Sequence, residues 1–226
     1  MDRALIEQVR SGDRKALARA ISLVESRHLS EVGSAKSVIG ITGPPGAGKS
    51  TLISAMISEF RNRGETVAVL AVDPSSPLTG GALLGDRIRM QDHIGDKGVY
   101  IRSMATRGHL GGLAGAAGDA LALMSEAGFD RLIVETVGVG QSEVEVMNYA
   151  DVVVLVIGPS WGDQIQADKA GIVEIADVFV INKADRPGVE EVRRALHEVA
   201  GDRPTLVTTA TTAEGVPELI ELLAAR

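Results

Sequence analysis

Residues 39–52 read IGITGPPGAGKSTL. This stretch contains the pattern G-x-x-x-x-G-K-S from Gly43 to Ser50, preceded by an apolar run of strand length at residues 37–41 and followed by a helical pattern at residues 49–60. A glycine-rich loop between a strand and a helix directs backbone N–H groups and the positive end of the helix dipole at a bound phosphate. The alternative is a glycine-rich turn that fits by chance, and the flanking strand and helix disfavour it. The stretch therefore predicts a loop that binds the phosphates of a nucleotide.

The residue types in this loop indicate which groups would contact the nucleotide. Pro44 and Pro45 have no N–H to donate, so the amides of residues 46–51 are expected to bind the phosphates. Lys49 would neutralise charge on the β- and γ-phosphates, and the hydroxyl of Ser50 would bind Mg²⁺. The predicted nucleotide-binding residues of the loop are Gly43, Gly46, Ala47, Gly48, Lys49, Ser50 and Thr51.

The composition excludes several other kinds of protein. The chain has 226 residues, a formal net charge of −7, four histidines and no cysteine. An acidic surface repels nucleic-acid phosphates, so we expect no nucleic-acid partner. Without cysteine there can be no disulfide and no thiolate metal site. No apolar run reaches the length of a membrane span and no signal peptide is evident, so we expect no membrane association and a cytoplasmic location.

The pattern of apolar runs predicts the fold class. Six further runs of strand length alternate with helical segments and are expected as strands at residues 66–72, 99–103, 131–135, 151–157, 177–181 and 205–208. Runs that are apolar throughout are typical of parallel strands covered on both faces. We therefore expect an α/β protein: a three-layer P-loop NTPase fold with a mostly parallel central sheet and helices on both faces.

Two other segments complete the predicted organisation. Apolar residues at helical spacing across residues 1–28, interrupted at Ser11 and Gly12, predict a short helical segment with Asp13 capping its second helix. We place this segment at residues 1–36 and the nucleotide-binding domain at residues 37–226. Further helices are expected at residues 119–127, 162–176, 189–199 and 215–225. Residues 107–118 are rich in glycine and are expected to be a linker.

Acidic residues at strand ends suggest the rest of the phosphate site. Asp73 follows the predicted strand at residues 66–72, where ligands of open α/β sheets bind. Glu135 ends another strand, and Gly138 follows it at the spacing typical of a loop whose glycine amide senses the γ-phosphate. Gln141 could position the attacking water. From spacing alone, Asp86 is equally well interpreted as a solvated acid of a long loop.

A second motif, NKAD at residues 182–185, predicts the base. The carboxylate of Asp185 can accept hydrogen bonds from the ring N–H and the exocyclic amine of guanine, and adenine does not offer this pair of donors. Asn182 would brace the phosphate loop, and the stem of Lys183 would cover the base. Thr209 and Ala210 lie where a later loop could touch the base. The expected ligands are therefore GTP and GDP with Mg²⁺.

These motifs together resemble the MeaB/ArgK-type G proteins, which are P-loop GTPases. The matching stretches are GPPGAGKST, AVDPSSPLTGGALLGDRIRM, ETVGVGQSEVEV and GDQIQADKAGIVEIADVFVINKAD. The resemblance implies a mostly parallel seven-stranded sheet and a site in which Ser50, Asp73, Asp86 and Glu135 hold Mg²⁺. Lys49, Asp86, Glu135 and Gln141 are the residues expected to act in hydrolysis.

The resemblance also implies a biological role. GTP binding and hydrolysis would gate the loading of adenosylcobalamin onto an adenosylcobalamin-dependent acyl-CoA mutase and would protect that mutase. Hydrolysis is expected to be slow and partner-stimulated, because no basic residue near the loop is an obvious arginine finger. Family members usually continue into a C-terminal helical arm that mediates dimerisation. Because the sequence stops at Arg226, a homodimer would have to form without that arm.

Three alternatives from other classes remain open at this point. The first is a nickel-type metallochaperone, although such proteins use cysteine and histidine clusters. The second is a kinase that phosphorylates a transport protein, for which the sequence indicates no acceptor site. The third is a scaffold in which GTP is only structural.

Overall fold

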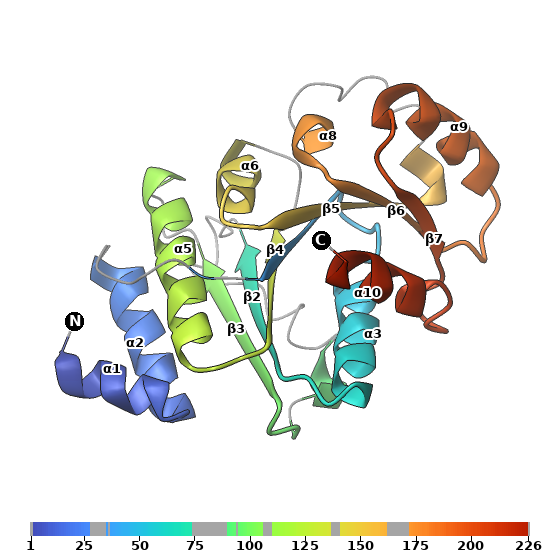
Figure 1. Ribbon diagram of the computed structural model, residues 1–226. Coiled ribbons are helices and arrows are strands. Elements are labelled where there is room, and N and C mark those ends of the chain that lie inside the picture. The colour runs from blue at the N-terminus through green and yellow to red at the C-terminus, as the bar shows by residue number, and fades with distance from the viewer. Residues whose placement is uncertain are drawn as a thin grey trace.

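The computed structural model describes residues 2–27, 35, 37–73, 90–93, 95–105, 110–136, 141–161 and 172–225 (Figure 1). Its centre is a seven-stranded sheet with the strand order β3-β2-β4-β1-β5-β6-β7. The strands are β1 Val38–Thr42, β2 Val67–Asp73, β3 Val99–Ala105, β4 Arg131–Thr136, β5 Val152–Ile157, β6 Val178–Asn182 and β7 Thr205–Thr208. Every neighbouring pair is parallel, so the predicted α/β class and all seven predicted strands are confirmed.

Helices cover both faces of this sheet (Figure 1). They are α1 Arg3–Arg10, α2 Arg14–Arg27, α3 Lys49–Asn62, α5 Leu110–Glu126, α6 Gln141–Met147, α8 Ile172–Ile175, α9 Val189–Ala200 and α10 Val216–Ala224, with short 3₁₀ helices η1 Gln91–His93 and η2 Pro159–Trp161. The core clusters place α3 and α10 on one face and the other α-helices on the opposite face. The result is the expected three-layer arrangement.

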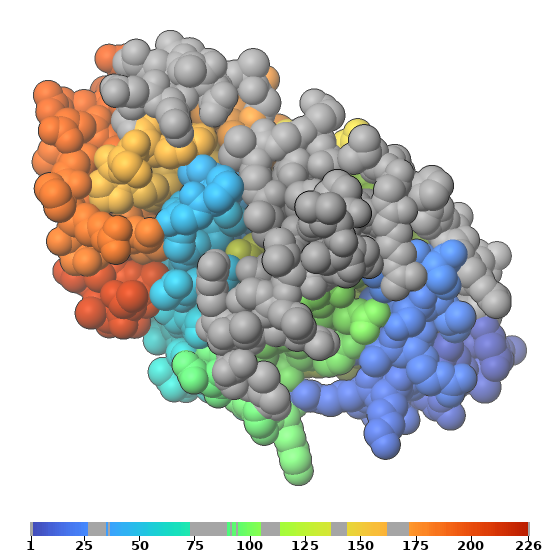
Figure 2. Space-filling view, turned by 180° about the vertical axis from the view of Figure 1, so that it is seen from behind, coloured from blue at the N-terminus to red at the C-terminus, as the bar shows by residue number. Residues whose placement is uncertain are grey.

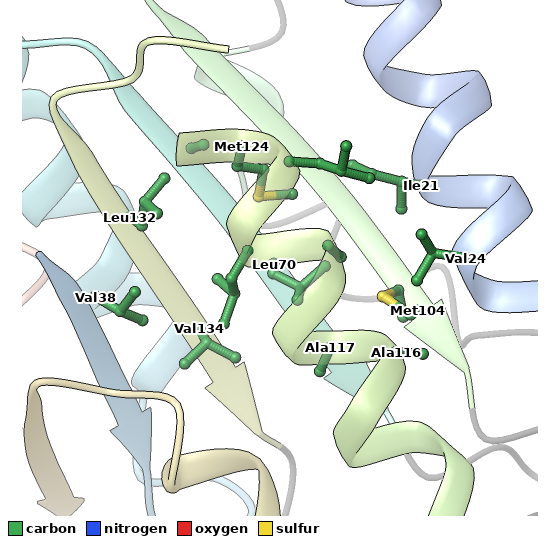
Figure 3. Packing of buried hydrophobic residues seen from close by; sticks show 14 of the residues in the cluster. Ile21, Val24, Val38, Leu70, Met104, Ala116, Ala117, Met124, Leu132 and Val134 are labelled. Atoms are coloured by element: carbon green, nitrogen blue, oxygen red, sulfur yellow. The ribbon is translucent and has the colours of Figure 1, made fainter. Parts of the chain in front are cut away.

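The alternation of side-chain direction along each strand explains how one sheet contributes to hydrophobic cores on both of its faces. In β1, Val38 belongs to the cluster under α5, whereas Ile39 and Ile41 belong to the cluster under α3. All five residues of β1 are buried, because successive side chains point to opposite faces and both faces are covered. Figure 3 shows the first of these cores from close by, with Leu70 and Val134 of the sheet beside Ala117 of α5.

The N-terminal helices pack onto this same core. The carboxylate of Asp13 accepts hydrogen bonds from the backbone N–H groups of Lys15 (2.8 Å) and Ala16 (3.2 Å), so the predicted cap of α2 is confirmed. Arg14 donates a 2.9 Å bond to the carbonyl of Val99 at the start of edge strand β3. The helices therefore cover the β3 end of the sheet, far from the C-terminal elements (Figure 2).

Within the described residues, the structure corrects one predicted boundary and adds one helix. Of the helix predicted at residues 162–176 it describes only α8, and residues 162–171 lie outside the described residues. Helix α5 begins at Leu110, so the prediction of a glycine-rich linker at residues 107–118 is wrong over residues 110–118. The small residues there allow close packing: a Cβ on Gly118 would lie 2.3 Å from the ring of Tyr149. Helix α6 was not predicted, because its seven residues are too few to show a clear apolar period.

Candidate functional site

The predicted site residues follow strands that all end at one edge of the sheet. Because β1, β2, β4, β6 and β7 are parallel, the segments that follow their carboxyl ends emerge at the same edge. This edge is where open α/β sheets bind their ligands. The structure therefore gathers residues that are more than 150 positions apart in the sequence of the chain, from Gly43 to Ala210.

The phosphate loop between β1 and α3 depends on glycines at positions where a side chain has no room. Gly43 has φ +140°, and a Cβ there would lie 2.0 Å from the carbonyl oxygen of Val156. Gly48 has φ +92°, and its Cβ would lie 2.4 Å from the side-chain nitrogen of Asn182. Both positions combine a left-handed backbone with a close neighbour, so only glycine fits without strain. The loop geometry is thus set by its contacts with β5 and β6.

Lys49 lies inside the loop. Its ammonium donates hydrogen bonds to the carbonyl oxygens of Gly43 (2.7 Å) and Pro44 (3.1 Å). The side chain is buried, and it begins helix α3, whose N-terminus adds a partial positive charge. The loop therefore presents a concentrated positive potential, as an anionic ligand requires.

Ser50 and Glu135 meet across the sheet edge. The hydroxyl of Ser50, in the first turn of α3, donates a 2.8 Å hydrogen bond to a carboxylate oxygen of Glu135, at the end of β4. Only 3% of Ser50 and 1% of Glu135 are exposed, so bulk water does not separate them. The structure thus brings together two oxygen donors of the type that Mg²⁺ prefers.

The remaining predicted acids are described only in part. The backbone of Asp73 ends β2, whose preceding residue Val72 is in register with Thr136 of β4. Gln141 is the first residue of α6. The structure does not describe the side chains of these two residues, and Asp86 and Gly138 lie outside the described residues.

Asn182 joins three loops. Its side-chain nitrogen donates to the carbonyls of Ala47 (3.0 Å) and Gly48 (3.4 Å) in the phosphate loop. Its side-chain oxygen accepts from the backbone N–H of Ala210 and the hydroxyl of Thr208, each at 3.1 Å. Asn182 is only 1% exposed, so these bonds form away from solvent. They position the phosphate loop against the segments that follow β6 and β7.

The predicted base-binding residues emerge side by side. Asn182 and Thr208 are in register on β6 and β7, so the segments that carry Asp185 and Thr209 leave the sheet together. Ala184 donates a backbone bond of 3.1 Å to Thr208, and Lys183 donates a side-chain bond to the carbonyl of Gly46. The side chain of Asp185 is exposed. Thr209 and Ala210, which follow β7, are buried.

A pocket of about 570 Å³ adjoins the phosphate loop. Its lining includes Pro45 and Gly46 of the loop, Lys183, Arg186 and the single tryptophan of the chain, Trp161. Trp161 is 9% exposed and also packs in the core beneath α9. Trp161 therefore belongs both to the wall of the pocket and to the core.

Residues that precede β3 pack and hydrogen-bond against α3. Met90 is fully buried in the core that contains α3, and the ring nitrogen Nε2 of His93 lies 2.9 Å from the hydroxyl of Ser54. Arg61 of α3 holds Asp96 with two bonds of 2.8 and 3.2 Å. The Arg61 guanidinium and the backbone N–H of Gly98 together hold the pKa of Asp96 below its ordinary value. No sequence pattern indicates this anchor, because its residues have no regular spacing.

Two further polar contacts at the sheet edge were not anticipated. Thr42 and Thr136 are hydrogen-bonded to each other at the ends of β1 and β4, and Thr208 holds Asn182. The available signal was a hydroxyl residue at the end of an otherwise apolar run.

Within the described part of the chain, no group of three or more His, Cys, Asp or Glu side chains is arranged to hold a metal ion. The same residues include no helix long and apolar enough to span a bilayer.

Comparison with known proteins gives consistent results. Residues 4–225 match the family model described as "Methylmalonyl Co-A mutase-associated GTPase MeaB". A Pyrococcus horikoshii protein named as a GTPase is 49% identical over 237 residues, which cover 96% of this chain and 75% of that protein. The methylmalonic aciduria type A homolog of Caenorhabditis elegans is 40% identical over 205 residues, covering 80% of this chain and 51% of its own length. A solved structure titled LAO/AO transport system kinase superposes with a TM-score of 0.73 at 30% identity, covering 100% of this chain and 76% of that one.

Proposed function

The chain belongs to the MeaB family of GTPases, and from that premise we propose that it is a GTP-hydrolysing chaperone of an adenosylcobalamin-dependent acyl-CoA mutase. In this role, the nucleotide state gates the loading of adenosylcobalamin onto the mutase and protects the loaded enzyme. The observation that carries the proposal is the continuous site from Lys49 through Asn182 to Ala210, found in a chain whose family is described as mutase-associated.

The chemistry that we propose for the site is transfer of the γ-phosphoryl group to water. The water oxygen forms a bond to the γ-phosphorus while the bond from that phosphorus to the β–γ bridging oxygen breaks, and GDP and phosphate leave. Lys49, the amides of residues 46–51 and the N-terminus of α3 stabilise the negative charge that develops on the phosphate oxygens. Gln141 is proposed to orient the water. The turnover of the isolated protein is proposed to be slow and to rise when the partner binds.

Mg²⁺ is part of this proposal. Ser50 and Glu135 supply a buried hydroxyl and a carboxylate within 2.8 Å of each other, and these are suitable donors for the ion. Asp73 and Asp86 are proposed to complete its surroundings. When bound, Mg²⁺ neutralises phosphate charge.

Guanine selectivity is assigned to Asp185. The described contacts support this assignment because Asn182 holds the phosphate loop against the segment that carries Ala210, next to the segment that carries Asp185. A purine base placed there would meet the carboxylate at its Watson–Crick edge, under the stem of Lys183. We propose that Thr209 and Ala210 contact the base from the opposite side.

A loading assay tests the proposed role. Apo-mutase is mixed with adenosylcobalamin in the presence of this protein and either GTP, GDP or a non-hydrolysable GTP analogue, and cofactor uptake is followed by absorbance. We expect the rate or extent of loading to differ between GTP and the other two nucleotides. Identical loading with all three nucleotides, and without the protein, would exclude the gating role.

The solved structure titled as a transport-system kinase supports a second candidate function, protein phosphorylation. The two functions differ in the acceptor of the γ-phosphoryl group, which is water for a GTPase and a protein side chain for a kinase. Labelled γ-phosphate would appear as free phosphate in the first case and on a protein band in the second.

A further inference from the structure

Thr42 and Thr136 form a buried pair at the ends of two neighbouring strands. The hydroxyl of Thr136 donates a 3.1 Å hydrogen bond to the hydroxyl of Thr42. Both residues are 0% exposed. Because solvent does not reach this bond, the hydroxyl that remains after the other is removed loses a hydrogen bond that water cannot replace.

Each threonine of the pair is next in the sequence to a residue of the proposed site. Thr42 precedes Gly43, the first residue of the phosphate loop, and Thr136 follows Glu135. Backbone register between β1 and β4 extends to Ile41 and Glu135, and the hydroxyl bond joins the next residue of each strand. The side-chain bond therefore extends the connection between the strands to the point where the phosphate loop begins.

Two hydrogen bonds thus hold this end of β4, one on each face of the sheet. Successive side chains of a strand point to opposite faces, so Glu135 faces α3 and Thr136 faces the other layer. On the first face Glu135 accepts from Ser50 of α3, and on the second Thr136 donates to Thr42 of β1. A rotation of the strand end that moved Glu135 would have to break or stretch the threonine pair.

Helix α6 is placed over β1, the strand that carries Thr42. A Cβ on Gly40 of β1 would lie 2.6 Å from the sulfur of Met147, so the missing side chain of Gly40 lets α6 rest on β1. Thr136, at the end of β4, and Met147, in the helix α6, therefore both lie against β1.

We infer that the Thr42–Thr136 hydroxyl pair is a positioning device for GTP hydrolysis, which holds Glu135 at a fixed distance from the phosphate loop. This inference rests on the proposed role of Glu135 in the site. The pair does not touch the nucleotide, so it acts through the alignment of groups that do. Its loss should reduce turnover and the preference for a γ-phosphate, and should leave the binding of GDP nearly unchanged.

The test uses the full chain and variants that separate the hydroxyl from the packing volume. Thr136→Val removes the donor, Thr136→Ser retains it, and the double variant Thr42→Val with Thr136→Val removes both hydroxyls of the pair. Thr66→Val is the matched control, because Thr66 donates a hydroxyl bond to Asp130 before β2, at the opposite edge of the sheet. For each protein, kcat and KM for GTP, Kd for GDP and for a non-hydrolysable GTP analogue, and thermal stability are measured.

We expect Thr136→Val to lower kcat about tenfold and to weaken the analogue relative to GDP by a similar factor, since one buried hydrogen bond is at stake. Thr136→Ser should retain kcat to within about twofold, and the double variant should show a kcat about as low as that of Thr136→Val. Normal kcat in the double variant would overturn the inference, as would an equal loss in Thr66→Val. If Thr136→Val does not fold, the double variant decides.

One further variant distinguishes a failure of this inference from a failure of the proposed role of Glu135. Glu135→Gln should impair hydrolysis if Glu135 acts as proposed. Impaired Glu135→Gln together with an unaffected double threonine variant would refute the positioning role alone. An unaffected Glu135→Gln would refute the role of Glu135, on which the inference rests.

Discussion

The hydroxyl of Ser50 lies 2.8 Å from a carboxylate oxygen of Glu135, and this hydrogen bond links the first turn of α3 to the end of β4. The two residues are 85 positions apart in the sequence. They meet because β1 and β4 are adjacent and parallel, so the helix that follows β1 starts beside the last residues of β4. A hydroxyl and a carboxylate buried together form an arrangement that a cation can use.

Glu135→Gln should slow hydrolysis with little effect on folding. The amide oxygen of glutamine can still accept from Ser50, whereas the negative charge is lost. We expect kcat to fall about 100-fold and the Mg²⁺ concentration for half-maximal activity to rise. Phosphate release at graded Mg²⁺ concentrations measures both. The matched control is Glu59→Gln, a surface residue of α3 that pairs with Arg63. Normal activity and a normal Mg²⁺ requirement in Glu135→Gln would contradict the proposed site.

Asp185→Asn should change the preferred base. An asparagine offers one acceptor and one donor, which match the ring N–H and the 2-carbonyl of xanthine. We expect GTP affinity to fall about 100-fold, because the bond from the exocyclic amine is lost and the bond from the ring N–H is no longer charge-assisted, and we expect xanthosine triphosphate to bind better than GTP. Competition against a fluorescent guanine nucleotide provides the measurement, and Asp202→Asn, in the turn after α9, serves as control. Equal loss of both nucleotides would show that Asp185 does not read the base.

Two glycines of the phosphate loop should differ sharply in their tolerance of alanine. Gly46 has φ +78°, and no atom of the described residues lies within 4 Å of the position that a Cβ would take, so Gly46→Ala should cost only about 1–2 kcal/mol for the left-handed backbone. Gly43→Ala would place its Cβ 2.0 Å from the carbonyl of Val156 and should abolish nucleotide binding. Urea unfolding and nucleotide titration separate the two. Similar behaviour of both variants would contradict the described loop geometry.

Much of the fold could be predicted because its signals are local. Each strand is an apolar run, and the loop glycines and NKAD stand at strand ends, so parallel topology alone brings them together. Helix α5 was only partly predicted, because glycine lowers intrinsic helix propensity and its benefit, close contact with Tyr149, arises from tertiary packing. The Thr42–Thr136 bond was not predictable, because strand order decides which strand ends are neighbours.

Asp96 should make a pH-dependent contribution to stability. Its bonds with Arg61 and Gly98 lower its pKa in the folded state, so the contribution is present above the ordinary carboxyl pKa of about 3.9 and is lost as pH falls through the folded value. We expect Asp96→Asn to lower the urea midpoint at neutral pH, and the gap from the wild type to close in strong acid. Parallel midpoint curves across the acid range would refute this contribution.

The central claim is tested most directly by GTP hydrolysis with and without a cobalamin-dependent acyl-CoA mutase from the same source. The wild type is compared with Lys49→Ala, which removes the buried ammonium of the phosphate loop, and with Lys15→Ala on the surface of α2 as the control. We predict that the mutase stimulates hydrolysis by the wild type and by Lys15→Ala, and that Lys49→Ala shows no stimulated turnover. Turnover that no such mutase changes would contradict the chaperone role and would leave a GTPase that serves another partner.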